Sequence, residues 1–277
     1  MIATLIGDIG GTKSSWYLRK ETSERSFKSS GFNPFVHSDE SLLTMLDSVH
    51  QEVLEEPVEV FYYGSGVSHQ DWRIKVEAAL QSTLRITRLE VHSDLLGAAR
   101  GVCIREAGLV GILGTGSNLC HYDGHAIDHQ ANSLGWPLGD EGSGTHIAKK
   151  LIKALYYNHL SAEAESLCHQ FLPRDRLEFL SNFKTASHQN QFLAGIVKKM
   201  AEFKQYPEFQ TIVRSSFKDF LAAHLGRQHF HEKINFIGSI AFYFCDDLRI
   251  VLQEAGYSLG RVERDPLNGL IKYHLSN

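Results

Sequence analysis

The sequence predicts an α/β fold with a partly parallel sheet, and three observations support this. From residue 40 to residue 106 the chain alternates helix-like and strand-like apolar patterns. An apolar run at 2–6 passes through a glycine turn into a second strand-like run at 14–18. The same order of strand, small Gly/Thr/Ser turn and strand returns at 109–122, about a hundred residues later. The 277 residues suffice for one large domain or two smaller ones, with ample core.

The predicted elements follow from apolar spacing and from residues that break structure. For example, Leu42, Leu46 and Val49 repeat at helical spacing, and Pro57 ends the helix that they define. Strands are predicted in this way at 2–6, 14–18, 25–30, 58–63, 84–91, 109–113, 119–122 and 234–237. Helices are predicted at 40–55, 70–83, 95–106, 145–157 and 267–274, and from 238–241 to about 254. The stretch 161–230 is predicted to be helical, with breaks near Pro173, Ser187 and Pro207.

Composition and charge narrow the classes of function. A formal net charge of −4 gives no general basic surface for nucleic acid or a membrane. The N-terminus lacks a signal peptide pattern and no apolar run nears the roughly 18 residues of a spanning helix, so a cytoplasmic protein is expected. The four cysteines are scattered, which favours reduced core thiols over a metal cluster. His121, His125 and His129 have the spacing of helical metal ligands, but Asp123-Gly124 favours a hairpin turn there.

The first glycine turn organises the prediction of function. Gly10 and Gly11 are expected to enter the φ > 0 region and to let backbone N–H groups approach an anion. Thr12 and Lys13 add a hydroxyl and a cation, and Asp8 is a hard oxygen ligand suited to Mg²⁺. Because a carboxylate repels a phosphate unless a cation lies between them, the set indicates a metal–nucleotide site. The alternative is an ordinary glycine hairpin with a capping Asp. A P-loop is excluded, because that motif is followed by a helix and a strand-like run follows here.

Two further strand ends carry candidate residues. The second glycine turn, Gly114 to Ser117, repeats the pattern of the first, and Leu119 in the third glycine's place excludes a dinucleotide fingerprint. Asp94 follows the strand at 84–91, at the end where α/β sheets bind ligands. A simpler role for Ser93 or Asp94 is the N-cap of the next helix.

Three loop segments could contact a sugar or a base. Asn33 lies in a proline-containing loop, where its amide suits sugar hydroxyls or forms a turn. The glycine-rich loop 135–144 carries Trp136, which lines a sugar site or packs within the loop. The same loop carries Asp140, an acceptor for sugar hydroxyls. Small residues at 238–241, between a strand and a helix, would let a flat ring pack on the backbone.

Together these segments resemble the superfamily of sugar kinases, heat-shock chaperones and actin. More narrowly, the chain is similar to an N-acetylglucosamine kinase of the BadF/BadG/BcrA/BcrD ATPase group, over nearly its whole length. The resemblance rests on D-I-G-G-T-K at 8–13, S-D-L-L-G-A-A at 93–99, G-T-G-S-N at 114–118, G-W-P-L-G-D-E-G-S at 135–143 and I-G-S-I-A at 237–241. It implies two ribonuclease-H-like (actin-like ATPase) lobes around a nucleotide cleft. The expected N-terminal lobe is 1–112 plus 263–277, and the expected C-terminal lobe is 113–262.

The resemblance also implies roles for individual residues. Asp8 would hold Mg²⁺, and Asp94 would be the general base that accepts the proton of the sugar 6-hydroxyl. ATP phosphates would lie against Gly10, Gly11, Thr12, Lys13, Gly114, Thr115, Gly116 and Ser117, with adenosine beside Gly238 and Ser239. Sugar contacts would come from Asn33, Asp94, Thr115, Ser133, Gly135, Trp136 and Asp140. The implied protein is a homodimeric, ATP-dependent kinase of a small amino sugar.

Alternatives stay open at this point. A BadF-type ATPase that activates a partner enzyme would need clustered cysteines, and the four cysteines here are dispersed. Among kinases, the residues are equally compatible with N-acetylglucosamine, N-acetylmuramate, glucosamine or N-acetylmannosamine as the acceptor.

Overall fold

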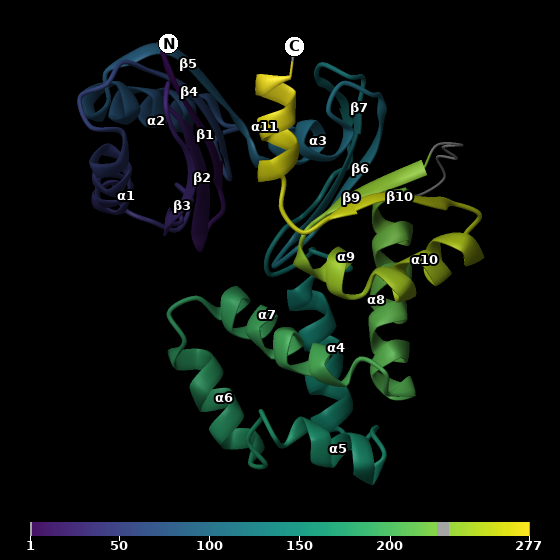
Figure 1. The fold of residues 1–277 in the computed structure, drawn as a ribbon. Coiled ribbons are helices and arrows are strands. Elements are labelled where there is room, and N and C mark those ends of the chain that lie inside the picture. Colours follow the sequence, from purple (N-terminus) through teal and green to yellow (C-terminus); the bar gives the residue numbers. More distant parts are fainter. Residues whose placement is uncertain (1, 226–232, 277) are drawn as a thin grey trace. The chain divides into compact units, whose positions relative to one another are not determined.

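The chain forms two compact units, shown in the computed structural model of Figure 1. The first unit comprises Met1–Glu106, Gly124–Ile127 and Asp265–Asn277, and the second comprises Ala107–Asp123 and Asp128–Arg264. The structure describes residues 2–225 and 233–276. The last part of the helical stretch predicted at 161–230, residues 226–230, lies outside the described residues.

A five-stranded mixed sheet forms the centre of the first unit, in the order β3-β2-β1-β4-β5. The strands are β1 (Ala3–Ile9), β2 (Lys13–Arg19), β3 (Glu24–Ser30), β4 (Val58–Gly64) and β5 (Ile86–Ser93). The pairs β1–β2 and β2–β3 are antiparallel, whereas β1–β4 and β4–β5 are parallel. The parallel pairs bring the carboxyl ends of β1, β4 and β5 to one edge, where α/β sheets place their sites.

Helices cover both faces of this sheet because successive strand residues point to opposite sides. On one face, Leu5 and Val60 pack with apolar residues of α1 (Asp39–Val53) and α2 (Gln70–Thr83). On the other, Ile6 and Phe61 pack against Leu270 of α11 (Leu267–Leu275). The helix α3 (Asp94–Cys103) lies against α11, where a Cβ on Gly269 would collide with the Gly101 carbonyl. The C-terminal helix therefore completes the core of the first unit.

The second unit repeats the same sheet topology, in the order β10-β9-β6-β7-β8. Its strands are β6 (Gly108–Leu113), β7 (Ser117–Tyr122), β8 (Ile127–Gln130), β9 (Lys233–Ile237) and β10 (Ser258–Glu263). In each unit the first strand turns back into an antiparallel hairpin and pairs on its other edge with a parallel strand. The expected N-terminal lobe extends to residue 112, whereas the first unit ends this part of the chain at Glu106. The difference is strand β6, which pairs with β7 and β9 in the second sheet.

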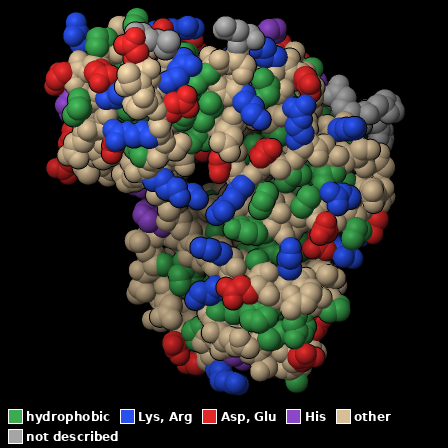
Figure 2. Space-filling model, viewed as in Figure 1, with side chains coloured by type: hydrophobic (Ala, Val, Ile, Leu, Met, Phe, Trp, Pro, Cys, Tyr) green, Lys and Arg blue, Asp and Glu red, His purple; other side chains and the backbone are tan. Residues whose placement is uncertain are grey.

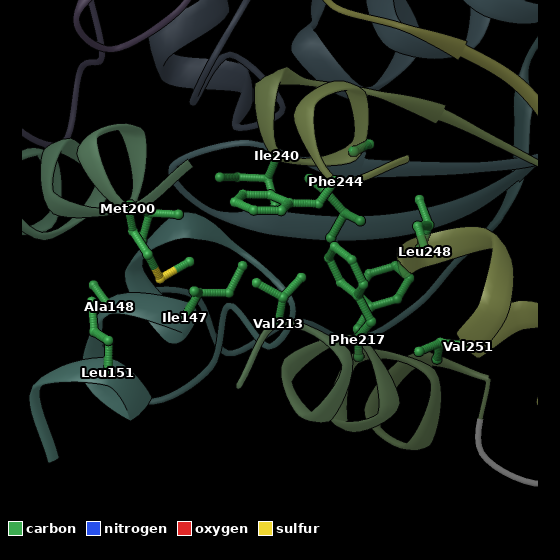
Figure 3. Close-up of a cluster of buried hydrophobic side chains, with 14 of the residues drawn as sticks. Ile147, Ala148, Leu151, Met200, Val213, Phe217, Ile240, Phe244, Leu248 and Val251 are labelled. Atoms are coloured by element: carbon green, nitrogen blue, oxygen red, sulfur yellow. The ribbon is translucent and has the colours of Figure 1, made fainter. Parts of the chain in front are cut away.

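Helices after β8 supply most of the second unit's core. They are α4 (Gly144–Tyr156), α5 (Ala162–Cys168), α6 (Arg176–Thr185), α7 (Gln189–Met200), α8 (Pro207–His224), α9 (Ser239–Tyr243) and α10 (Cys245–Glu254), with a 3₁₀ turn at Ala201–Phe203. Figure 3 shows Ile147 of α4, Met200 of α7 and Phe217 of α8 converging with residues of α9 and α10. This cluster holds the N-terminus of α4 in place beside the second glycine turn.

The predicted elements agree with the structure except at three places. The strand β10 was not predicted, because Gly260 and a register shift between Leu259 and Val262 interrupt its alternation. The short strand β8 was not predicted either. The helix expected from 238–241 to 254 is divided into α9 and α10 at Phe244.

The surface mixes charges of both signs, as Figure 2 shows for the visible face. Among the described residues, no helix has the length and apolar character needed to cross a membrane. The hairpin predicted at Asp123-Gly124 is confirmed, since His121 lies on β7, His129 on β8 and His125 between the two strands.

Candidate functional site

The first glycine turn is held by backbone hydrogen bonds to the segment after β3. The N–H of Phe32 donates to the Gly10 carbonyl at 3.0 Å, and that of Gly31 donates to Thr12 at 3.2 Å. The prediction that the adjacent glycines need positive φ is wrong, because neither Gly10 nor Gly11 adopts it. A Cβ at Gly11 would make only an ordinary contact, 3.6 Å from the Asn33 Cβ. The missing side chain therefore leaves room for a ligand and does not relieve backbone strain.

Asp8 lies beside this turn, within range of the charges of two other carboxylates of the first unit. Asp8 lies at the end of β1, and its pKa is raised to about 7 by burial and by the nearby charges of Asp94 and Asp265, with Lys13 opposing the shift. A divalent cation would relieve this repulsion, and Mg²⁺ in proteins is commonly held by one or two carboxylates, water and phosphate oxygens. A buried carboxylate near two others has the chemistry to hold such a partly hydrated cation.

Asp265 is a residue that sequence reasoning missed. It lies just before α11, and its carboxylate accepts a hydrogen bond from the Leu267 N–H at 3.4 Å. Nothing in the local sequence pattern marks it, because its nearness to Asp8 depends on the return of the chain to the first sheet after Arg264.

Asp94 is the first residue of α3, and it does not cap this helix. The cap is Ser93, whose hydroxyl accepts a hydrogen bond from the Leu96 N–H at 3.2 Å. One oxygen of Asp94 accepts from the Leu95 N–H at 2.9 Å and the other from the Ser65 hydroxyl at 2.7 Å. These two bonds fix the orientation of the carboxylate at the carboxyl edge of the sheet.

Asn33 forms the turn that its sequence context allowed, and its amide lies beside two glycine-containing loops. Its side-chain oxygen accepts a hydrogen bond from the Phe35 N–H at 3.0 Å, which is a local turn. The same oxygen lies 3.2 Å from where a Cβ of Gly66 would be, and the amide nitrogen lies 4.0 Å from that of Gly11. Asn33 therefore lies between the first glycine turn and the Gly64–Gly66 loop that carries the partner of Asp94.

The second glycine turn is attached to the N-terminus of α4. The Gly144 N–H donates to the Gly114 carbonyl at 2.8 Å, and the Thr145 N–H donates to Thr115 at 3.4 Å. Ser143 caps the helix by accepting from the His146 N–H at 3.3 Å. Because the N-terminus of a helix is its positive end, this attachment favours an anion at the turn.

Asp140 supports the second turn from the loop before α4. Its carboxylate accepts from the Ser117 N–H at 3.1 Å, and a Cβ on Gly116 would lie 2.8 Å from the same oxygen. Burial raises the pKa of Asp140. The hydroxyl of Ser117 is buried and has no hydrogen-bond partner within the described part of the chain. A buried hydroxyl without a partner is unfavourable, so this atom is suited to a ligand.

Two other predicted residues lie beside this turn. The Ser133 hydroxyl donates to the Ser117 carbonyl at 3.4 Å and accepts from the Gly135 N–H at 3.3 Å. The ring of Trp136 has the Lys149 ammonium 4.6 Å from its centroid, which is a cation–π contact. The loop is thus tied to both the turn and α4.

Gly238 joins β9 to α9 with φ of 125°, a conformation that glycine adopts readily. A Cβ here would collide with the Leu113 carbonyl and would lie 3.2 Å from the Gly114 nitrogen. Ser239 follows as the first residue of α9. The junction therefore packs backbone to backbone against the second turn.

The predicted site residues fall into two groups. In the first unit the structure brings together Asp8, Gly10, Gly11, Thr12, Lys13, Asn33 and Asp94. In the second unit it brings together Gly114, Thr115, Gly116, Ser117, Ser133, Gly135, Trp136, Asp140, Gly238 and Ser239.

Comparison with solved structures finds similar chains along the full length. The structure of a protein named a putative N-acetylglucosamine kinase from Porphyromonas gingivalis matches with 34% identity and a TM-score of 0.89, covering 100% of this chain and 99% of that one. One of the same name from Chromobacterium violaceum matches with 18% identity and a TM-score of 0.75, covering 99% of each. MreB5 of Spiroplasma citri, in a structure bound to ADP, shares the fold with 11% identity and a TM-score of 0.52, covering 99% of this chain and 95% of that one.

No protein-family profile and no curated protein sequence matches the chain.

Proposed function

Because the chain belongs to the N-acetylglucosamine kinase family, with two α/β units of the actin-like ATPase type, we propose that it is an ATP-dependent sugar kinase. Its reaction would transfer the γ-phosphoryl group of ATP to the 6-hydroxyl of N-acetylglucosamine or a close amino sugar. The observation that carries this proposal is Asp94, an oriented carboxylate at a strand end beside the carboxylates of Asp8 and Asp265.

The first unit would hold the metal and activate the acceptor. Bound Mg²⁺ would neutralise charge on the phosphoryl group in transfer. Asp8 would hold it, since a cation would offset both the burial and the nearby carboxylate charges that raise the pKa of Asp8 to about 7. Asp94 would accept the proton of the sugar hydroxyl, with its geometry set by Ser65 and the Leu95 N–H.

The second unit would bind phosphates and sugar. Gly114 to Ser117 would receive phosphate oxygens, supported by the positive end of α4 and by the buried Ser117 hydroxyl. Gly238 and Ser239 would lie beside adenosine. Ser133, Gly135 and Trp136 would contact the sugar, and Asn33 is a proposed sugar contact in the first unit. One oxygen of Asp140 accepts a hydrogen bond from the Ser117 N–H. Only the other oxygen would accept a hydrogen bond from a sugar hydroxyl.

A coupled ADP-release assay tests the activity. The acceptors are N-acetylglucosamine, N-acetylmuramate, glucosamine and N-acetylmannosamine, with 6-deoxy-N-acetylglucosamine as the matched control. We expect Mg²⁺-dependent turnover on at least one amino sugar and none on the 6-deoxy compound, which lacks the acceptor hydroxyl. Absence of turnover on every amino sugar would reject the kinase proposal, and turnover on the 6-deoxy compound would reject O6.

Oligomeric state is tested separately. The homodimer implied by the family remains part of the proposal. Sedimentation equilibrium of the full chain should give twice its mass of 31.2 kDa. A monomer at micromolar concentration would contradict it.

A further inference from the structure

A row of polar side chains crosses the first sheet on the face that carries Asp8. The strand register places Thr4 of β1 opposite Arg19 of β2 and Glu59 of β4, and Glu59 opposite Arg88 of β5. Because side chains alternate along a strand, Thr4 and Asp8 share a face and lie four residues apart, roughly 13 Å at 3.3 Å per residue. The row is therefore distinct from the Asp8 site, on the same face of the sheet.

A cavity of about 360 Å³ lies over this row. Its other walls include Arg100 of α3, Arg105 just after α3, and Tyr273 and His274 of α11. All of these residues belong to the first unit. The cavity is large enough for a small phosphorylated metabolite.

The cavity has an excess of positive charge. Four arginines, Arg19, Arg88, Arg100 and Arg105, face two glutamates, Glu59 and Glu90. Burial lowers the pKa of His274 to about 4, so this ring is neutral at pH 7 and adds no charge. The excess of two positive charges contrasts with the net charge of −4 for the chain and with the mixed surface of Figure 2.

The guanidinium groups are held in place before any ligand arrives. Arg100 and Arg105 each lie 4.7 Å from the centroid of the Tyr273 ring, one cation–π contact each. Arg105 donates to the Tyr273 carbonyl at 3.2 Å, and Arg88 donates to a Glu90 oxygen at 2.7 Å. Such preorganisation lowers the entropy lost on binding.

Arg19 differs from the other three arginines. Its Nε is buried and has no hydrogen-bond partner in residues 2–225 and 233–276. Glu59, the nearest acidic residue along the row, lies across Thr4 from Arg19. A buried donor without a partner is unfavourable, and a charged acceptor in the cavity would satisfy it.

We infer that this cavity is a second ligand site, which binds the dianionic phosphate group of a small phosphorylated metabolite. Arginine forks match phosphate oxygens in geometry as well as in charge, and two excess positive charges match one dianion. The rings of Tyr273 and Phe61 line the cavity and support the guanidinium groups that lie over them. The inference does not depend on the proposed kinase activity.

Calorimetric titration of the full chain tests the site, with inorganic phosphate and a hexose 6-phosphate as separate probes. Arg19→Gln and Arg88→Gln should each weaken binding about tenfold, since a charge-assisted bond to phosphate is lost. Arg25→Gln is the matched control, because Arg25 lies on the neighbouring strand β3 and pairs with Glu52 outside the cavity. The dissociation constant of Arg25→Gln for each probe should equal that of the wild type.

The two probes separate the source of affinity. Equal binding of both would assign it to the phosphate group, and tighter binding of the hexose 6-phosphate would add a contribution from its skeleton. Arg19→Lys, which keeps the charge without the fork, should bind with intermediate affinity and checks that loss is not misfolding. The inference is overturned if neither probe binds, if Arg19→Gln and Arg88→Gln bind like the wild type, or if binding is lost only in Gly114→Val at the second glycine turn.

Discussion

The two glycine turns share a topology and differ in what surrounds them. Each connects the first two strands of a sheet whose strand order is the same in both units. The first turn lies near Asp8, whose pKa is raised by burial and by the nearby charges of Asp94 and Asp265. The second turn is bonded to the N-terminus of α4, and a buried Ser117 hydroxyl lies at its end.

This difference shows that one hairpin topology supports two kinds of electrostatic site. The negative surroundings of the first turn suit a cation, and a phosphate would bind there only together with that cation. The positive helix end behind the second turn suits a phosphate directly. The predictions below test this division of roles, from the largest expected effect to the smallest.

Asp94→Asn should give the largest effect. Asn keeps the volume but cannot accept the hydroxyl proton, so kcat should fall by roughly 10²–10⁴. The lower end is expected, because loose phosphoryl transfer needs little activation of the nucleophile. Steady-state kinetics at saturating substrates measure the change, with exposed Asp71→Asn in α2 as the matched control. A near-normal kcat would remove Asp94 from the catalytic residues.

Substitutions at the second turn distinguish a position that faces open space from one that packs against the protein. Gly114→Ala adds a methyl with no protein atom within 4 Å, so its Tm should be unchanged while KM for ATP rises about tenfold or more. Gly116→Ala places a methyl 2.8 Å from the Asp140 carboxylate, so it should also lower Tm. Thermal melts and ATP titrations measure both. If Gly114→Ala leaves KM for ATP unchanged, phosphates do not approach this turn.

The first turn should respond to pH and metal. In the folded state the pKa of Asp8 is raised from 3.8 to about 7, so the protonated form stabilises the fold below pH 4 and this contribution is lost as pH rises to 7. The loss is at most about 4 kcal/mol, at about 1.4 kcal/mol per pKa unit. Without metal, Asp8→Asn should therefore be more stable than the wild type at pH 8 and similar at pH 4.

Added Mg²⁺ completes this test. At pH 8 it should raise the unfolding free energy of the wild type more than that of Asp8→Asn, as measured by urea denaturation. An equal response of the two proteins would assign the metal to other groups. A wild-type stability that does not fall between pH 4 and pH 7 would contradict the raised pKa.

Ser93→Ala should give the smallest effect. Loss of the N-cap hydroxyl of α3 should cost about 1 kcal/mol of stability. Because Asp94 keeps its bonds to Ser65 and to the Leu95 N–H, kcat should change less than threefold. A loss of kcat as large as that of Asp94→Asn would mean that the cap, and not the carboxylate, determines activity.

The sequence predicted local features well and contacts between distant segments poorly. The helix at 70–83 has the predicted bounds, because its spacing and flanking residues are local signals. The positions of both turns were predicted for the same reason. The choice between Ser93 and Asp94 as the cap needed geometry, since either residue type caps a helix.

The features missed depend on parts of the chain that are distant in sequence. Asp265 lies near Asp8 only because the last segment returns to the first sheet. Asp140 reaches Ser117 across 23 positions, and periodicity does not encode such a pair. The position of the first glycine turn was predicted correctly for the wrong reason: neither glycine adopts positive φ, and the space next to the backbone is at Gly11.

The packing of α11 on the first sheet also bears on how the chain folds during synthesis. The second unit ends at Arg264, whereas the first still lacks Leu267 and Leu270, which cover Ile6 and Phe61. Since domains fold as units while the ribosome works, the inserted unit can finish first and the unit that begins the chain must finish last. Protease resistance of chains stalled after Arg264 would reveal this order. Until the last helix emerges, the apolar patch around Ile6 and Phe61 stays uncovered on the sheet that carries Asp8, which is a surface for chaperones to bind.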